Sequence, residues 1–509
     1  MTGRNGEIRS HGAKPPLAGD QAATGITGLD DILRGGFARG CVFLLEGNPG
    51  TGKTTIALQF LRTGAAEGEK GLYITLSESE RELRSGAASH GWDIDGNIEV
   101  FELQPPDSVL DEGQQQSLLY ASDLELGETT RQIVAVIERC RAQRIVLDSL
   151  SEIRLLSQGS LRYRRQLLAL KHYFVRHGST VLMLDDMTAD SRDKTVHSIV
   201  HGVVRLEELA PSYGAERRRL RVMKYRGRSF RGGYHDFSIK TGGVQVFPRL
   251  VAAEFRSEFA RRQIASDIPE LDALLGGGLE AGSSCLVLGP AGTGKSTCVF
   301  QFATAAVRRG ERAAIFVFDE ELGLLLDRSR AMGFDLAAMR NSGMLHIEQL
   351  DAAELTPGEF AHRVRSIVDR AAVKTVAIDS LNGYQAAMPE ENSLVLHVHE
   401  LLQYLNRRGA TTFLTVAQQG LVGDMKSPVD ITYLADTVIL LRYFEAMGSV
   451  RRAVSVIKKR TGRHEATIRE YRVTADGGLV LDKPLENFQG VLRGVPMVLG
   501  TDGSVGRDL

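Results

Sequence analysis

The sequence predicts an α/β fold made of two tandem domains, and three observations support this prediction. Apolar, β-rich runs alternate with segments of helical periodicity, a pattern typical of parallel βαβ units with helices on both faces of a sheet. A glycine-rich motif follows an apolar run in each half, and other short motifs recur in the same order in both halves, as expected for a duplicated domain. The length of 509 residues also fits two domains.

The first half contains five predicted strands and four predicted helices. Because residues 145–147 are all apolar, the fourth strand is expected to be buried on both faces. The strands cover residues 42–45, 71–75, 98–101, 144–147 and 180–184, and the helices cover residues 54–66, 80–88, 128–141 and 161–177. Each half then ends in a β-rich stretch, at residues 203–206 and 220–222 in the first and 438–441 and 454–457 in the second.

Two phosphate-binding loops (P-loops) carry the first chemical prediction. Residues 47–54 and 289–296 both match G-x-x-x-x-G-K-[ST], and each lies between an apolar run and a helical segment, as this motif requires. The glycines allow backbone N–H groups to face phosphate oxygens, and the next helix adds partial positive charge. The lysine reaches the terminal phosphates, and the hydroxyls of Thr54 and Ser296 are the predicted Mg²⁺ ligands. The predicted nucleotide-binding residues of these loops are Gly47, Gly50, Thr51, Gly52, Lys53, Thr54 and Thr55 in the first half, and Gly289, Gly292, Thr293, Gly294, Lys295, Ser296 and Thr297 in the second.

An aspartate closes an apolar strand in each half. Asp148 and Asp379 are both followed by serine, and an aspartate at the carboxyl end of a strand can hold the water shell of Mg²⁺ beside a P-loop. The alternative is a helix N-cap, for which Asp and Ser are both common. The P-loop upstream of each aspartate favours the Mg²⁺ role, so both residues are predicted to belong to the nucleotide sites.

Acidic residues also follow the second strand of each half. Glu78 in the first half and Asp319 with Glu320 in the second are candidates to orient or deprotonate an attacking water or hydroxyl beside the γ-phosphate. A loop acid in solvent is the alternative interpretation. The equivalent placement in both halves favours a catalytic role.

Two cations occur late in each half, on β-rich segments. Lys224 with Arg226, and Lys458 with Arg460, are predicted to reach the nucleotide of a neighbouring subunit, as an arginine finger does. The first pair lies within the arginine-rich run 217–231, which leaves two alternatives open: a nucleic-acid patch and a solvated hairpin.

Composition limits the class of protein. Lys and Arg number 62 against 63 Asp and Glu, so no overall charge points to nucleic acid or a membrane surface. No apolar run is long enough to span a bilayer, and residues 1–20 resemble a disordered tail, not a signal peptide. Four cysteines (Cys41, Cys140, Cys285, Cys298) lack C-x-x-C spacing and are expected to be reduced residues of a cytoplasmic protein.

Together these features resemble the KaiC family of circadian-clock ATPases and autokinases. The resemblance rests on the Leu-Asp…Gly-Gly lead-in before each P-loop, the acidic residues after the second strand and the late Lys-x-Arg, and it extends from about residue 21 to 496. It implies two RecA-like P-loop NTPase domains, at 21–250 and 251–496, with a C-terminal tail at 497–509. It also implies ATP and Mg²⁺ as cofactors and a homohexameric double ring with ATP between subunits.

The resemblance further implies a division of labour, in which the first ring hydrolyses ATP and the second transfers phosphate to its own hydroxyls. By position, the acceptors are Thr432 and Tyr433, with Ser427 as a third hydroxyl; a turn or strand role is the alternative for Thr432. The first domain departs from the family at Ser77, where the first of two carboxylates is missing. In the second domain, Asp319 is shorter than the usual Glu.

Three functional interpretations follow. The first is a hexameric ATPase and Ser/Thr autokinase that acts as a signalling or timing switch. The second is an ATP-dependent scaffold that docks a signalling protein, with slow hydrolysis and no kinase activity. The third, a RecA- or RadA-like DNA motor, is disfavoured by the near-neutral charge and by the lack of a Cys-rich zinc ribbon. We expect the first interpretation, without a membrane partner.

Overall fold

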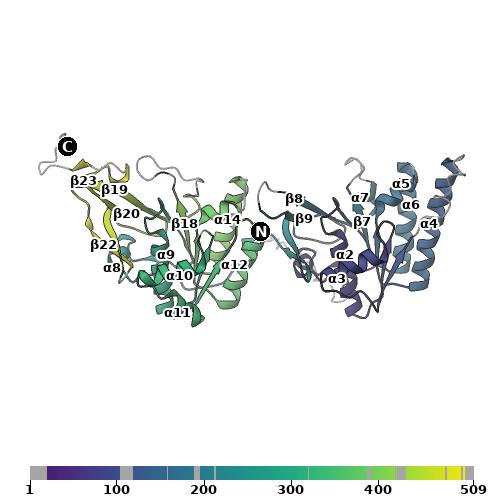
Figure 1. The fold of residues 1–509 in the computed structure, drawn as a ribbon, viewed down its shortest axis with the longest axis horizontal. Helices are drawn as coiled ribbons and strands as arrows, with labels where there is room; N and C mark the ends of the chain where they lie inside the picture. The colour runs from purple at the N-terminus through teal and green to yellow at the C-terminus, as the bar shows by residue number, and fades with distance from the viewer. Residues whose placement is uncertain are drawn as a thin grey trace, which may run out of the picture. The chain divides into compact units, whose positions relative to one another are not determined.

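The computed structural model describes residues 20–103, 118–157, 159–187, 195–210, 214–318, 320–386, 391–418, 420, 431–475, 478–493 and 497–498. The chain divides into two compact units, which are Met1–Pro211 with Glu216–Arg249, and Ser212–Ala215 with Leu250–Leu509. Each unit contains a nine-stranded sheet, with helices on both faces (Figure 1). The predicted α/β class and the tandem arrangement are confirmed.

The first sheet has the strand order β11-β10-β9-β8-β3-β7-β6-β4-β5. Strands β8, β3, β7, β6, β4 and β5 run parallel, and β9, β10 and β11 extend the sheet as an antiparallel meander. The bounds are β3 Val42–Gly47, β4 Gly71–Thr75, β5 Ile98–Glu102, β6 Arg144–Asp148, β7 Thr180–Asp186, β8 Gly202–Leu209, β9 Arg217–Tyr225, β10 His235–Lys240 and β11 Gly243–Phe247.

The second sheet repeats this topology, with the order β16-β15-β17-β18-β14-β19-β20-β21-β22. The bounds are β14 Ser284–Gly289, β15 Ala313–Val317, β16 Leu345–Gln349, β17 Thr375–Asp379, β18 Thr411–Ala417, β19 Thr437–Ala446, β20 Ser449–Lys459, β21 Arg469–Thr474 and β22 Gly478–Pro484. Short strand pairs complete the units: β1 Gln21–Ala22 with β2 Phe37–Ala38, β12 Gln263–Ile264 with β13 Leu279–Glu280, and β23 Phe488–Gln489 with β24 Met497–Val498. Strand β24 falls at the start of the stretch expected to be a tail.

The helices of the first unit are α1 Thr27–Ile32, α2 Lys53–Ala66, α3 Glu80–Ser89, α4 Leu118–Cys140, α5 Leu150–Ser157, α6 Ser160–His177 and α7 Thr195–Ile199. Those of the second are α8 Pro269–Leu274, α9 Lys295–Arg308, α10 Leu322–Ala331, α11 Leu336–Asn341, α12 Pro357–Ala371, α13 Leu381–Ala386 and α14 Glu391–Arg407, with 3₁₀ turns at Ala252–Glu254 and Val491–Arg493. The prediction of a helix over 128–141 was too short, because α4 continues through Gly127 despite the low helical propensity of glycine.

Local sequence explains where several helices begin. Helix α3 starts with a capping box, in which Ser79 accepts a hydrogen bond from the Glu82 N–H and the Glu82 side chain accepts one from the Ser79 N–H. Helix α12 combines Thr356 as N-cap with Pro357 in the first turn, where a missing N–H costs nothing. Both helices therefore have starts that are encoded locally.

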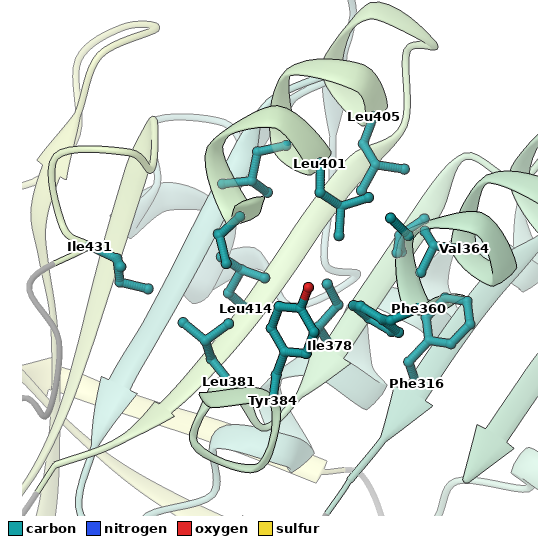
Figure 2. Close-up of a cluster of buried hydrophobic side chains, with 14 of the residues drawn as sticks. Phe316, Phe360, Val364, Ile378, Leu381, Tyr384, Leu401, Leu405, Leu414 and Ile431 are labelled. Carbon is teal, nitrogen blue, oxygen red and sulfur yellow. The ribbon is translucent and has the colours of Figure 1, made fainter. Parts of the chain in front are cut away.

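Apolar side chains fill the space on both faces of each sheet. In the first unit one cluster lies under α2 and α3 and another under α4 to α6. Figure 2 shows the larger cluster of the second unit, in which the Phe360 ring lies between Phe316 and Tyr384, with ring centroids at 5.8 and 4.7 Å. Burial of each such side chain contributes about 1.5–3 kcal/mol, so these clusters fix the helices on the sheets.

The cysteines are unpaired, and burial raises the pKa of two of their thiols. All four cysteines are free thiols, three are buried and Cys41 is half-buried. Burial raises the pKa of Cys140 to about 11 and that of Cys298 to about 12. In the described part of the chain, every helix is too short or too polar to cross a bilayer.

Candidate functional site

Backbone geometry requires glycine in the first P-loop, which connects β3 to α2. Gly50 and Gly52 have φ of +83° and +93°, in the left-handed region that favours glycine. A Cβ at Gly52 would also lie 2.5 Å from the Ile239 side chain. The buried Thr51 donates its hydroxyl hydrogen to the Asn48 carbonyl at 2.8 Å, which closes the loop on itself.

The second P-loop, between β14 and α9, has the same construction. Gly292 and Gly294 have φ of +78° and +94°. Thr293 donates to the Pro290 carbonyl at 2.8 Å, and Tyr471 donates to the Thr293 carbonyl. The two loops therefore adopt one conformation, as their shared motif predicts.

Helices α2 and α9 begin without a side-chain cap. Their N-caps are Gly52 and Gly294, which have no side chain to accept a hydrogen bond from the first-turn N–H groups. Those N–H groups and the helix dipole suit an anion. Triphosphate oxygens fit this position, because they would supply the acceptors that the sequence leaves out.

The P-loop lysines are buried and turned toward their own loops. Lys53 Nζ donates to the carbonyls of Gly47 at 2.7 Å and Asn48 at 2.9 Å, and it pairs with Asp186 Oδ1 at 2.7 Å. Lys295 Nζ donates to the Pro290 carbonyl at 2.8 Å. Burial lowers the pKa of Lys295, and the charge of Asp379 partly offsets this.

Asp148 ends β6 next to the first P-loop. Tyr73 donates its hydroxyl hydrogen to Asp148 Oδ2 at 2.6 Å, and the Thr54 hydroxyl lies within hydrogen-bonding reach of the same phenol. Burial raises the pKa of Asp148 to about 6, and the nearby charges of Glu78 and Asp186 also raise it, while the Tyr73 bond and Lys53 lower it. This hydroxyl–carboxylate arrangement matches the oxygen ligands that Mg²⁺ prefers.

Asp379 takes the corresponding place at the end of β17. Thr415 donates its hydroxyl hydrogen to Asp379 Oδ1 at 2.5 Å, so a threonine of β18 replaces the tyrosine of the first site. Within the described ranges, no group of three or more His, Cys, Asp or Glu side chains is arranged to hold a metal ion. Any Mg²⁺ would therefore depend on the P-loop hydroxyl, one carboxylate and the phosphates.

Glu78 lies after β4 at the same sheet edge. Burial raises its pKa, and Glu82 and Asp186 raise it further, whereas Lys53 lowers it. A raised carboxyl pKa is what general-base work near neutral pH requires. Glu78 also lines a cavity of about 350 Å³ between α2 and α3, together with Thr54, Thr55, Leu58, Glu82, Leu83, Gly86, Ser89 and His90.

The acidic residues of the second site are placed differently. Glu320 forms a two-point ion pair with Arg328 of α10, at 2.9 and 2.6 Å, so its oxygens face that guanidinium. Asp319 lies outside the described residues. Ser296 is the second residue of α9, and the buried Thr297 contacts the Met332 sulfur at 3.5 Å.

The Lys-x-Arg pairs hold the segment that precedes β8 or β19. Lys224 donates to the carbonyls of Val200 at 2.8 Å and His197, and Arg226 donates to the Ser198 carbonyl at 2.7 Å. In the second unit the contacts recur at equivalent positions: Lys458 donates to the carbonyls of Thr432 at 2.8 Å and Ala435 at 2.7 Å, and Arg460 donates to the Tyr433 carbonyl at 2.7 Å.

These contacts place the predicted acceptors. Thr432 is half-buried, and the Tyr433 side chain is 53% exposed. The third hydroxyl, Ser427, lies outside the described residues.

Within one chain, the Lys-x-Arg pairs lie at the opposite end of the sheet from the P-loop. Lys458 pairs with Val438 near the start of β19, where β19 runs beside the start of β14. The P-loop follows Gly289 at the other end of β14. Six residues of strand separate the two ends, a distance of about 17–20 Å. In the first domain the structure thus brings together the P-loop, Asp148 and Glu78. In both domains the predicted cations lie far from the P-loop of the same chain, and so do the predicted acceptors of the second domain.

The arginine-rich run is largely neutralised by acids of its own unit. Arg218 pairs with Glu208 at 3.0 Å and with Glu216 at 2.9 Å, and Arg219 pairs with Glu207 at 2.8 Å. This pattern favours the hairpin interpretation over a nucleic-acid patch, because paired guanidinium groups have less charge to offer to phosphates.

The sequence interpretation missed several residues of the first site. Tyr73 gave no signal, because an aromatic residue inside an apolar strand suggests core. Asp186 did give a signal, because it ends an apolar strand as Asp148 does. Ser89 and His90 line the cavity between α2 and α3 only because of where α3 lies, which the sequence does not indicate.

Similarity to known proteins extends over nearly the whole chain. The sequence model of the family described as the ATPase KaiC matches residues 22–251 and 264–486. The circadian clock oscillator protein KaiC of Parasynechococcus marenigrum (strain WH8102) is 28% identical over 501 residues, covering 96% of each chain. The protein of that name from Prochlorococcus marinus (strain MIT 9313) is 29% identical over 493 residues, covering 96% of this chain and 97% of its own. The circadian clock protein KaiC3 of Synechocystis sp. is 28% identical over 486 residues, covering 94% and 95%.

Proposed function

We propose, from the premise that this chain belongs to the KaiC family of ATPases, that it is an ATPase which also transfers phosphate from ATP to a hydroxyl of its own second domain. The proposal is supported mainly by one observation: the P-loop and the Lys-x-Arg pair of each domain lie at opposite ends of the same sheet. A complete site then needs two copies, with the P-loop of one copy facing the cations of the next.

Each domain has one nucleotide-binding site. The uncapped helix starts at Gly52 and Gly294 suit the phosphates. Thr54 with Asp148, and Ser296 with Asp379, would hold Mg²⁺. That ion supplies neutralisation of phosphate charge when it is bound.

In the first domain the proposed reaction is hydrolysis. Glu78, whose pKa is raised mainly by burial, accepts a proton from the attacking water, and Lys53 stabilises the charge on the terminal phosphate. Lys224 and Arg226 of the next copy add positive charge to the same phosphates. Their side chains are already ordered by the carbonyls of the segment at residues 197–200.

In the second domain the proposed acceptor is Thr432 of a neighbouring copy, with Tyr433 as an alternative hydroxyl. Lys458 donates a hydrogen bond to the Thr432 carbonyl, and Arg460 donates one to the Tyr433 carbonyl. The cations that would contact the γ-phosphate therefore also position the acceptor segment. Asp319 or Glu320 accepts the hydroxyl proton. Glu320 must leave Arg328 to do so.

The assembly implied by this arrangement is the homohexameric double ring expected from the family, working in the cytoplasm. We assign residues 21–250 and 251–496 to the two domains. Several relatives are named as circadian clock proteins, which supports a timing or signalling role with a protein partner.

A second candidate is an ATP-dependent scaffold that hydrolyses slowly and does not phosphorylate itself. Two observations favour it: the Glu320–Arg328 ion pair, which occupies the second-site carboxylate, and Ser77, which leaves one carboxylate after β4 in the first site. In this candidate, ATP stabilises the rings, and the rings dock a signalling protein.

Labelled ATP separates the candidates. Wild type, Lys295→Ala and Thr432→Ala are incubated with γ-labelled ATP and Mg²⁺, and free phosphate and protein-bound label are followed. We expect wild type to retain label and both variants to lose it. Label lost only in Lys295→Ala moves the acceptor to Tyr433 or Ser427, and free phosphate without bound label supports the scaffold.

A further inference from the structure

The first site contains a carboxylate to which the proposed reaction assigns no role. Asp186 is the last residue of β7, and its Cα lies opposite Gly47, the first residue of the P-loop. Its Oδ1 lies 2.7 Å from Lys53 Nζ. Because β7 lies between β3 and β6, Asp186 stands at the catalytic edge between the P-loop and Asp148.

The second site has no carboxylate at the equivalent position of its described residues. Ala417 occupies the equivalent register, opposite Gly289. The second site keeps an acidic pair after its second strand, at residues 319–320, whereas the first site has Ser77 before Glu78. In sequence, two carboxylates follow the second strand of the second domain and one follows that of the first, and the first domain has a further carboxylate at the end of β7.

We propose that Asp186 is the second catalytic carboxylate of the first site, and that it holds the attacking water together with Glu78. The inference rests on the proposed ATP hydrolysis at this site. It explains how this domain can work with serine at position 77, because the carboxylate missing after β4 is replaced from β7.

The contacts of Lys53 explain how ATP would release Asp186 for this role. An ammonium group has three donors, and Lys53 uses them on Gly47, Asn48 and Asp186. Lys53 reaches the terminal phosphates when a triphosphate binds, so it must give up at least one partner. When Lys53 turns to the phosphates, the Asp186 carboxylate stays beside the position of the γ-phosphate.

Electrostatic coupling places Asp186 near the other acids of the site. Burial raises the pKa of Glu78, and the charges of Glu82 and Asp186 add to this rise. The pKa of Asp148 responds to Asp186 in the same direction, after burial and Glu78. These effects agree with the strand order, which places the end of β7 between the P-loop strand and β6.

The reaction balances without another reactant. The water oxygen forms a bond to the γ-phosphorus while the bond from that phosphorus to the ADP oxygen breaks, and the electron pair leaves with ADP. One water proton passes to Glu78, and the other hydrogen is donated in a hydrogen bond to Asp186. ADP and phosphate are the products.

The test uses the full chain with Lys295→Ala, so that only the first site turns over, and this variant is the reference. Asp186→Asn, Asp186→Asn with Ser77→Glu, and Asp185→Asn are added to it. Asp185→Asn is the matched control, because Asp185 precedes Asp186 on β7 but pairs with Arg154 at 2.6 Å. ATP affinity is measured by equilibrium dialysis, and hydrolysis is measured in single turnovers.

We expect Asp186→Asn to slow hydrolysis about tenfold or more while ATP affinity stays equal or becomes tighter, since Lys53 loses a competing anion. Ser77→Glu should restore a large part of the rate, and Asp185→Asn should match the reference. Unchanged hydrolysis in Asp186→Asn would overturn the inference, and so would a joint loss of affinity and rate that Ser77→Glu does not rescue. If the reference itself binds ATP without hydrolysing it, the proposed function fails at this site and the inference fails with it.

Discussion

At the scale of single residues, burial decides the chemistry of the first site. Asp148 is buried at the end of β6 and bonded to Tyr73, yet its pKa is raised to about 6, mainly by loss of water. A carboxyl with a raised pKa binds its proton in the folded protein at a pH where the unfolded chain has released it. The free energy of unfolding of the ligand-free protein therefore falls as pH rises through 6, because Asp148 must then be ionised in a buried position. A cation beside the carboxylate would offset this loss.

This sign gives a prediction for Mg²⁺-ATP. Near pH 6, where Asp148 is about half protonated, binding should release about half a proton from it, and affinity at the first site should weaken as pH falls below 6. Calorimetric titration of Lys295→Ala in two buffers of different ionisation enthalpy measures the released protons. Asp148→Asn in the same background should abolish the release. Equal release with and without Asp148 would contradict the assignment of this carboxyl to the Mg²⁺ site.

At the scale of elements, one buried arginine joins the P-loop helix to the sheet. Arg144 begins β6 and is 0% exposed. Its guanidinium donates to the carbonyls of Phe60 at 2.9 Å and Ala23 at 2.6 Å, and pairs with Glu69 at 2.5 Å. Helix α2 packs closely here, because a Cβ at Gly64 would lie 2.4 Å from Arg144 Cδ. The arginine therefore sets the distance between α2 and the central strands.

Replacement of Arg144 by Met should destabilise the first unit by about 3 kcal/mol, because carbonyls and a carboxylate lose their partner in a buried position. Trp92, the one tryptophan of the chain, belongs to the core of this unit. Urea unfolding followed by its fluorescence therefore reports on the first unit. Arg139→Met, which removes an exposed ion pair with Glu99, is the control and should change stability by about 0.5 kcal/mol or less.

The ion pair between Arg144 and Glu69 predicts that the stability of the first unit depends on pH in the acidic range. Burial raises the pKa of Glu69, but hydrogen bonds from Arg144 and Arg39 outweigh it and lower the pKa overall. A lowered pKa contributes stability above the ordinary value of 4.5, and this stability is lost as pH falls. Arg144→Met should thus lose stability less steeply than wild type below pH 4.5 in the same assay. An equal slope in both proteins would show that Arg144 is not the cause.

At the scale of the whole molecule, each sheet separates its P-loop from its own Lys-x-Arg pair. The P-loop lies at the carboxyl ends of the parallel strands, while Lys458, Arg460 and the acceptor segment lie at the amino end of β19. A strand length between them exceeds the reach of any side chain. Within one domain the P-loop therefore cannot reach the acceptor segment of the same domain, and transfer between copies is the route that the proposed function uses.

Mixed assemblies test this route. Lys295→Ala keeps the acceptor but lacks the P-loop lysine of the second domain, and Thr432→Ala keeps the lysine but lacks the acceptor. If transfer runs between copies, a mixture of the two unlabelled proteins should regain protein-bound label, and the label should appear on the Lys295→Ala chain. Two tags of different size identify that chain on a gel. Label on neither chain, when wild type is labelled, would contradict transfer to Thr432 between copies.

The sequence by itself determined the local features of this protein. The strands at 42–45, 71–75, 144–147 and 180–184 and the helices at 54–66 and 80–88 were found within a few residues, because each depends on short-range periodicity and caps. Both P-loops were found for the same reason, since glycine at left-handed φ is a local requirement. The repeat fixed the two-domain architecture.

Only the tertiary structure decided which of these residues meet. Asp186 reaches Lys53 because β7 inserts between β3 and β6, an order that no sequence window contains. Tyr73 became a partner of Asp148 through the parallel pairing of β4 and β6, and Glu320 faced Arg328 through the position of α10. The distance from Lys458 to its own P-loop likewise follows from strand direction. These are long-range consequences of sheet order, and local pattern carries no information about them.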